Sequence, residues 1–258
     1  MEFLGLFLFL AIVVLLLWML KEAFLNKVVR KELQFSAFPA SFGKVSIFFI
    51  SDIHRRNISD KIIREIKGQV DIVVIGGDIT EKGVPLERTK GNLKKLRNLG
   101  PTYFVWGNND YEIDYHKLKT IFFEHGIKIL DNTAVVFESN TGDKITLIGV
   151  DDLALGRDRL DLALMDVEEN SFKILASHNP QIIKKFSPEL NISLVLSGHT
   201  HGGQIRIFGL GPYERGKIKK IHHTTLLNSN GYGTTSIPLR LGAPAECHLI
   251  TVKGDCHE

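Results

Sequence analysis

The stretch VSIFFISDIH, residues 45–54, contains the two features that decide the fold. Its first six residues do not alternate between polar and apolar, and β-branched and aromatic types dominate, which predicts a strand buried on both faces. Its end carries Asp52 and His54, two polar side chains directly after the buried run. Polar residues in this position are typical of a ligand-binding loop at the carboxyl edge of an α/β sheet.

Four further apolar runs also end in short polar clusters. The clusters are GGD (76–78), GNND (107–110), SHN (177–179) and GHTH (198–201). Each follows a run that predicts a buried strand, at residues 72–75, 102–105, 173–176 and 192–196 respectively. Because ligands of such sheets bind beyond the carboxyl ends of the strands, side chains distant in sequence are expected to converge there.

Together the clusters supply the ligand types of a two-metal site. The candidate ligands among them are two carboxylates (Asp52 and Asp78), one amide oxygen (Asn108) and four imidazoles (His54, His178, His199 and His201). Any one of these residues could instead cap a helix or satisfy a turn. The occurrence of all of them directly after buried strands predicts two divalent cations that share one bridging aspartate and hydrolyse phosphate esters.

The rest of the pattern alternates strands with amphipathic helices and then becomes richer in strands. Helices are expected at residues 59–66, 85–99, 115–124 and 180–186, and further strands at 135–137, 145–150, 204–208, 224–227 and 246–252. The pattern favours an α/β fold, an α+β four-layer sandwich of two mixed β-sheets flanked by helices.

The N-terminal region differs in composition from the rest of the chain. Phe3 to Leu20 is an uninterrupted apolar run, which as a helix spans roughly 27 Å, close to the hydrocarbon thickness of a bilayer. No basic residue precedes the run and no small-residue cleavage site follows it, which favours an uncleaved anchor over a signal peptide. Lys21, Lys27, Arg30 and Lys31 follow the run, so the positive-inside bias predicts a single-pass protein of the cell membrane with its catalytic domain on the cytoplasmic face.

Three regions are therefore expected. Residues 1–20 form the transmembrane anchor, 21–43 a juxtamembrane helix and linker, and 44–258 the catalytic domain. The net charge of +3 over 258 residues gives no indication of a nucleic-acid partner. Two cysteines, Cys247 and Cys256, support neither a disulfide framework nor a thiolate metal site.

The order D-x-H, G-D, G-N-x-D, H and G-H-x-H resembles the calcineurin-like metallophosphoesterase superfamily over residues 45–252. The resemblance implies that one metal is held by Asp52, His54, Asp78 and His201, and the other by Asp78, Asn108, His178 and His199. Nitrogen and oxygen ligands without thiolate suit Mn²⁺, Fe or Zn²⁺. Such a pair hydrolyses a phosphodiester, phosphomonoester or pyrophosphate bond with a metal-activated hydroxide.

One departure from the family pattern concerns the leaving group. Asn109 stands where the family usually has a histidine that assists departure of the leaving group. Loss of a general acid typically costs about 10²–10⁴-fold in rate, and a good leaving group such as phosphate suffers least. Asp78, Asn108, Asn109 and His178 are the residues expected to act in catalysis.

The C-terminal part narrows the resemblance. GHTHGGQ (198–204) and the segment 229–246 are similar to a membrane-associated bacterial branch that includes UDP-2,3-diacylglucosamine pyrophosphatases. Arg240 in this segment is a candidate phosphate clamp, because a guanidinium binds two oxygens at once, or it braces an edge strand. Arg55 is a second candidate for phosphate binding.

Three functions remain open from the sequence. The leading one is a membrane-anchored two-metal phosphoesterase, whose anchor favours a lipid-linked or membrane-proximal phosphate-ester substrate. An alternative is a phosphatase or nucleotide phosphodiesterase that acts on a soluble substrate and is only localised by the membrane. A third is a metal-binding interaction module with weak catalysis, for which Asn109 is the only indication.

Overall fold

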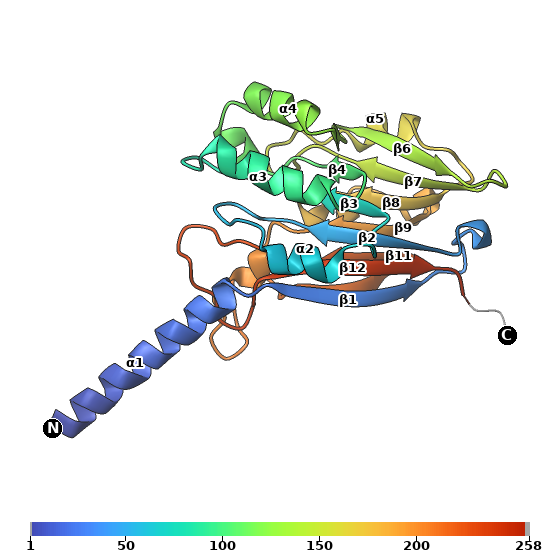
Figure 1. The fold of residues 1–258 in the computed structure, drawn as a ribbon. Coiled ribbons are helices and arrows are strands. Elements are labelled where there is room, and N and C mark those ends of the chain that lie inside the picture. The colour runs from blue at the N-terminus through green and yellow to red at the C-terminus, as the bar shows by residue number, and fades with distance from the viewer. Residues whose placement is uncertain (1, 256–258) are drawn as a thin grey trace.

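The computed structural model describes residues 2–255, and two six-stranded sheets packed face to face form its centre (Figure 1). The first sheet has the order β1-β12-β2-β3-β4-β5. Its strands are β1 (Lys27–Gln34), β2 (Lys44–Ile50), β3 (Ile72–Ile75), β4 (Thr102–Phe104), β5 (Ile127–Ile129) and β12 (Glu246–Lys253). In it β12 and β2 are antiparallel and the other neighbours are parallel.

The second sheet has the order β10-β11-β9-β8-β7-β6. Its strands are β6 (Thr133–Glu138), β7 (Lys144–Gly149), β8 (Phe172–Ala176), β9 (Ile192–Ser197), β10 (Lys217–Ile221) and β11 (Thr224–Asn228). The strands at its two edges pair antiparallel and the central strands pair parallel. The expected two mixed sheets are thus confirmed.

Helices cover the outer faces of both sheets, which makes the four layers. They are α2 (Asp60–Ile66), α3 (Leu86–Arg97), α4 (Tyr115–Glu124) and α5 (Leu160–Met165), with 3₁₀ turns η1 (Ala40–Phe42), η2 (Asn109–Glu112), η3 (Pro180–Lys184), η4 (Pro188–Leu190) and η5 (His201–Gly203). Ser59 caps α2 by accepting a hydrogen bond from the Lys61 N–H, as the sequence predicts.

The apolar character of β2 follows from this layering. Phe48 and Ile50 belong to the core beneath the helices α2, α3 and α4, whereas Ile47 and Phe49 belong to the core between the two sheets. All four side chains are fully buried, so neither face of the strand can carry a polar residue.

The N-terminal helix α1 (Glu2–Ala23) leaves the body of the molecule and is long and apolar enough to cross a membrane (Figure 1). Within residues 2–255, the hydrogen bonds that join α1 to the rest of the chain lie at its last turns. The Arg240 N–H donates to the Met19 carbonyl at 3.1 Å, and the Ala245 N–H donates to the Glu22 carbonyl at 3.0 Å. The Arg56 guanidinium caps the end of the helix through the carbonyls of Ala23 and the residues after it.

Two expectations about elements are wrong. Within the stretch 21–43, expected to be a helix and linker, residues 27–34 form the edge strand β1, which pairs parallel with β12 over its whole length. Its charged residues stay at the solvent-exposed edge while Val28 and Leu33 pack on the two cores, so a helical pattern is not required. Residues 204–208 form a loop held by isolated bridges of Ile205 to Leu241 and Gly242 and not a strand.

Candidate metal centre

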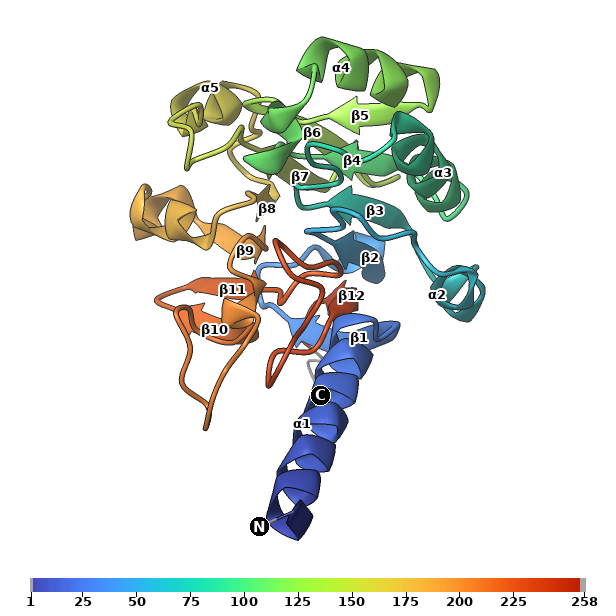
Figure 2. The same ribbon diagram turned by 90° about the vertical axis from the view of Figure 1, so that its left-hand side faces the viewer.

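The seven expected ligands converge at one rim of the molecule, formed by loops that follow β2, β3, β4, β8 and β9 (Figure 2). Their histidine rings meet in two pairs. His54 Nε2 lies 3.1 Å from His201 Nε2, and His178 Nε2 lies 3.1 Å from His199 Nδ1. Asp78 Oδ2 lies between the pairs, 3.2 Å from His178 Nε2 and 3.7 Å from His54 Nε2.

The second carboxylate completes the cluster. Asp52 Oδ1 is 3.4 Å from His201 Nε2 and also accepts a hydrogen bond from the His199 N–H at 3.0 Å. Two sets of side chains have ligand atoms close enough to hold one ion each, namely Asp52 with His54 and His201, and Asp52 with Asp78 and His178. Asp52 is thus common to both sets, while Asp78, the expected bridge, lies between histidines of both expected sites.

The amide of Asn108 is positioned as a further ligand. Its Oδ1 is buried and has no hydrogen-bond partner among the described residues, while its Nδ2 donates to Asn109 Oδ1 at 2.9 Å. A buried oxygen without a partner is costly unless something else binds it. An oxygen ligand to a divalent cation meets that requirement, so the donor set fits two cations of the Mn²⁺, Fe or Zn²⁺ type.

Other side chains and carbonyls hold the histidine rings in orientation. The Glu81 carboxylate lies 2.9 Å from His54 Nδ1, and the Gly76 carbonyl lies 2.8 Å from His178 Nδ1. Each contact occupies the ring nitrogen that faces away from the cluster, which leaves Nε2 to face Asp78.

Buried Asp110 fixes the loops that carry the ligands. It accepts hydrogen bonds from the N–H groups of Asp78, Thr80 and Gly107 at 2.8, 3.2 and 3.0 Å. Burial, and after it the charge of Asp78, raises the pKa of Asp110 to about 8. Asp110 belongs to the GNND cluster without a role predicted from the sequence, and Glu81 is not singled out from the sequence, although both lie within three residues of an expected ligand.

The backbone at the cluster is strained. Asp52, His54, Asp78, His199 and His201 all have positive φ, between 49° and 69°, which is uncommon for residues with a side chain. Such conformations persist only when the surrounding contacts impose them, and they cluster at functional sites.

Glycines make room for the ligands. A Cβ on Gly198 would lie 2.3 Å from Asp52 Oδ2, and a Cβ on Gly107 would lie 2.3 Å from Asp78 Oδ1. These two positions therefore tolerate no side chain without moving a carboxylate of the cluster.

The protonation of the histidines follows from burial and from the two carboxylates. Burial opposes protonation of His178, but the charge of Asp78 outweighs it and raises the pKa of His178 to about 10. Burial, together with the nearby charge of His54, lowers the pKa of His201 well below its ordinary value. A neutral imidazole is the form that binds a metal, so binding at His178 displaces a proton.

The candidate phosphate ligands lie in different surroundings. Arg240 is fully buried, and its guanidinium donates to the carbonyls of His201, Ala243, Asn230 and Gly233. It is therefore not available as a phosphate clamp; it braces the loop behind the cluster, because four converging carbonyls use up its donors. Arg55 has an exposed side chain and pairs with Glu81, next to His54.

A cavity of about 340 Å³ opens beside the cluster. It is bordered by Asp78, Asn108, Asn109, His199 and His201, and on its other side by residues of two loops, 203–213 and 235–237. The Asn109 amide donates to Glu112 Oε1 at 2.8 Å. Four of the seven expected ligands, Asp78, Asn108, His199 and His201, thus border a cavity that a small substrate can enter.

Comparison with known proteins agrees with this geometry. The family model described as calcineurin-like phosphoesterase matches residues 45–203. The chain is 46% identical over 212 residues to YpbG of Bacillus subtilis (strain 168), covering 81% of this chain and 82% of that one. It is 32% identical over 252 residues to a transmembrane protein with metallophosphoesterase domain of Danio rerio, covering 88% of this chain and 57% of that one.

A solved structure has the same fold. The phosphopantetheinyl hydrolase PptH of Mycobacterium tuberculosis superposes with a TM-score of 0.51 at 14% identity, covering 77% of this chain and 95% of that one. Sequence, fold and converging ligand types point to one conclusion. The chain belongs to the calcineurin-like phosphoesterase family and is a metal-dependent phosphoric ester hydrolase that uses two divalent metal ions.

Proposed function

We propose that the chain is a membrane-anchored phosphoesterase in which Asp52, His54, Asp78 and His201 hold one cation. Asp78, Asn108, His178 and His199 hold the other, with Asp78 between them. The observation that carries this assignment is the pairing of histidine nitrogens around Asp78 Oδ2 beside a buried Asn108 Oδ1 without a partner.

When bound, two such cations activate water and neutralise charge on the phosphoryl oxygens. The protein contributes orientation and a shaped cavity. Asn108 and Asn109 border the cavity, so their amides contact the phosphoryl group or the leaving group. Because the Asn109 amide cannot supply a proton, the enzyme favours substrates whose leaving group is weakly basic, such as a pyrophosphate or an aryl ester.

We assign α1 as the single membrane span and place the catalytic domain on the cytoplasmic face. The support is the apolar composition of α1, the basic residues that follow it, and the similarity to the transmembrane protein with metallophosphoesterase domain of Danio rerio. The anchor then comprises residues 1–20, and the catalytic domain includes β1, because β1 is an integral strand of the first sheet.

The place of the cavity supports our proposal of a lipid-linked substrate. The segment whose N–H groups hold the last turn of α1, residues 240–245, is continuous with residues 235–237 at the cavity rim. This continuity with the anchor supports a site that faces the membrane surface.

Two measurements test the proposal. Asp78→Asn is expected to abolish Mn²⁺-dependent hydrolysis of bis(p-nitrophenyl) phosphate; activity equal to the parent would refute the metal assignment. Deletion of residues 2–17, which keeps the docked turn of α1, is expected to lower turnover of vesicle-borne lipid pyrophosphates and leave bis(p-nitrophenyl) phosphate hydrolysis intact. Equal loss on both would contradict the membrane role.

A further inference from the structure

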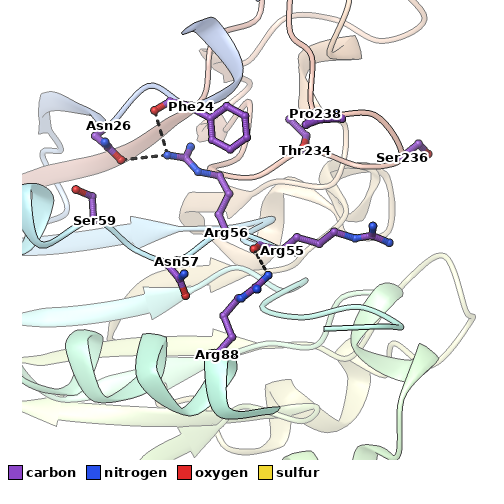
Figure 3. Close-up of a pocket in the computed structure, with 10 residues that line it drawn as sticks. All are labelled: Phe24, Asn26, Arg55, Arg56, Asn57, Ser59, Arg88, Thr234, Ser236 and Pro238. Atoms are coloured by element: carbon purple, nitrogen blue, oxygen red, sulfur yellow. Dashed lines mark hydrogen bonds between the residues drawn. The ribbon is translucent and has the colours of Figure 1, made fainter. Parts of the chain in front are cut away.

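A second cavity, of about 540 Å³, is lined by residues at the end of α1 and by residues that follow the ligand His54 (Figure 3). We call it the arginine cavity, because Arg55, Arg56 and Arg88 line it. Its other lining residues are polar or apolar, and none of those described is acidic.

The charge in this cavity is poorly compensated. Within residues 2–255, no carboxylate forms an ion pair with Arg56 or Arg88, and only Arg55 has one, with Glu81. Arg56 is buried, and its donors are used on carbonyls at the end of α1 and on Tyr232. These neutral carbonyls hold the Arg56 side chain in place but do not neutralise its positive charge. A site with net positive charge and no internal anion suits an anionic ligand.

Arg88 and Arg55 are the groups able to contact such a ligand. The Arg88 guanidinium donates one hydrogen bond, to the Arg55 carbonyl at 2.7 Å, and no other bond of its side chain occurs in the described chain. Figure 3 shows Arg88 reaching up to the backbone of Arg55. A guanidinium with free donors is suited to bind two phosphate oxygens at once.

The arginine cavity adjoins the metal cavity. Ser236 lines both, and Arg55 directly follows the ligand His54 and pairs with Glu81, which contacts His54. On its other side the cavity is lined by Phe24 and Asn26 at the end of α1. Phe24 follows Leu20, the end of the apolar run, by about 6 Å along the helix.

We propose that the arginine cavity binds a second phosphate group of the substrate, distinct from the one that is hydrolysed. The identification of the ligand as part of the substrate rests on the proposed function; the binding of phosphate does not. The phosphate comes either from a lipid headgroup at the membrane surface or from a soluble phosphorylated compound.

The test is equilibrium binding to the full-length protein in phosphatidylcholine nanodiscs, with EDTA present to exclude binding through metals. The ligands are dioctanoyl phosphatidic acid and sn-glycerol 3-phosphate. Arg88→Gln and Arg55→Gln are each expected to weaken binding about tenfold. Lys94→Gln, which removes an equal charge from an exposed position of α3, is the matched control and is expected to change nothing.

Each result decides a point. Absence of binding to the parent, or equal affinity in both arginine variants and the control, overturns the proposal. Tighter binding of phosphatidic acid than of glycerol 3-phosphate assigns the site to a lipid headgroup, and equal affinity assigns it to a soluble phosphate. If the protein is active but does not bind these phosphates, the proposal for the arginine cavity is wrong and the proposed function stands. If the protein binds them but is inactive, the proposed function is wrong and the phosphate site stands.

A second inference concerns exposed apolar residues on two loops, which we call the apolar tips. They are Ile207, Phe208 and Leu210 of the loop 204–216 and Ile237 of the loop 229–245, exposed by 61, 100, 78 and 51%. Figure 2 shows both loops extending toward the side on which α1 leaves the body. Adjacent exposed apolar side chains of this size mark an interaction site.

The loops are braced rather than loose. The Arg206 guanidinium donates to the carbonyls of Gly202, Gly209 and Tyr213 and so closes the first loop on itself. The Gln204 amide donates to the carbonyls of Thr235 and Ile237, both at 3.0 Å, and ties the two loops together. The apolar tips are therefore held outward, and because they lie on the side of the anchor we infer that they insert into the lipid bilayer.

Quenching by brominated phosphatidylcholine vesicles tests the insertion in the full-length protein. The two native tryptophans are Trp18 in α1 and buried Trp106. In a Trp18→Phe background, Phe208→Trp is expected to be quenched about as strongly as Trp18 is in the parent. Phe123→Trp on α4, an 86% exposed position at the opposite end of the molecule, is the control and is expected to stay unquenched (Figure 1).

Quenching of Trp18 without quenching at position 208 would overturn the insertion and leave the anchor standing. Absence of quenching at both positions would overturn the insertion and the anchor together. Equal quenching at positions 208 and 123 would show that contact with lipid is not specific to the apolar tips, which also overturns the inference.

Discussion

Replacement of Glu81 by glutamine tests whether the metal centre depends on a residue behind it. Glu81 is 6% exposed, and its carboxylate lies 2.9 Å from His54 Nδ1 and also pairs with Arg55. Glutamine keeps the size and an acceptor oxygen but removes the charge that makes the imidazole a stronger ligand.

The expected loss of Mn²⁺ affinity follows from the effect of a carboxylate that contacts a metal-binding histidine. Removal of a carboxylate partner of a metal-binding histidine typically costs about 10–100-fold in metal affinity or activity, or about 1.4–2.8 kcal/mol. We therefore expect the apparent Kd for Mn²⁺ to rise by this factor, with activity on bis(p-nitrophenyl) phosphate largely restored at saturating Mn²⁺. The measurement is a Mn²⁺ titration of initial rates.

Two further variants control the result. Glu87→Gln removes a carboxylate whose side chain is 80% exposed on α3, and it is expected to leave the titration unchanged. Arg55→Gln keeps the contact between Glu81 and His54 and is expected to shift the Mn²⁺ requirement much less than Glu81→Gln. A Glu81→Gln enzyme with the Mn²⁺ affinity and kcat/KM of the parent would refute the reasoning, because His54 would then need no carboxylate behind it.

Three other predictions concern a glycine beside the metal centre, buried His248 and Asn109. Gly198→Ala places a Cβ 2.3 Å from Asp52 Oδ2 and is expected to lower activity by about 100-fold or more. The control is Gly91→Ala in helix α3, whose Cβ meets nothing within 4 Å and which is expected to raise the free energy of unfolding by about 1 kcal/mol. Equal activity of both variants would contradict the steric argument. Burial lowers the pKa of His248 from 6.5 to about 3. Below pH 7 the unfolded chain therefore binds a proton that the folded protein does not, and the free energy of unfolding is expected to fall by about 2 kcal/mol between pH 7 and pH 5. His248→Gln is expected to flatten this pH dependence in urea titrations, and an unchanged pH dependence would argue against the assignment. Asn109→His restores a group able to donate a proton and is expected to raise kcat at least about tenfold for alkyl phosphodiesters and less for p-nitrophenyl esters; an equal gain on both would exclude help to the leaving group.

Much of the fold can be read from local patterns, because burial on two faces excludes polar residues. The strand before Asp52 has no polar alternation since Phe48 and Ile50 face the helices while Ile47 and Phe49 face the second sheet. The ligand types could be located for a related reason, as each stands directly after such a strand. Their assignment to individual ions remains a proposal.

The position of the N-terminal strand could not be read in this way. Residues 27–34 alternate weakly and carry four charges, and their partner lies at residues 246–253, more than two hundred positions further along. Local periodicity indicates which face of a segment is buried; it does not indicate which distant segment covers that face.

The same limit applies to the residues around the metal centre. The approach of Glu81 to His54 and the burial of Arg240 among four carbonyls depend on loops that meet only in the folded chain. Whether a guanidinium binds a phosphate or braces a loop is decided by the acceptors that surround it, and those acceptors are backbone groups that every residue type provides. The sequence determines the chemistry of each side chain, but the tertiary structure determines the environment that gives the side chain its role.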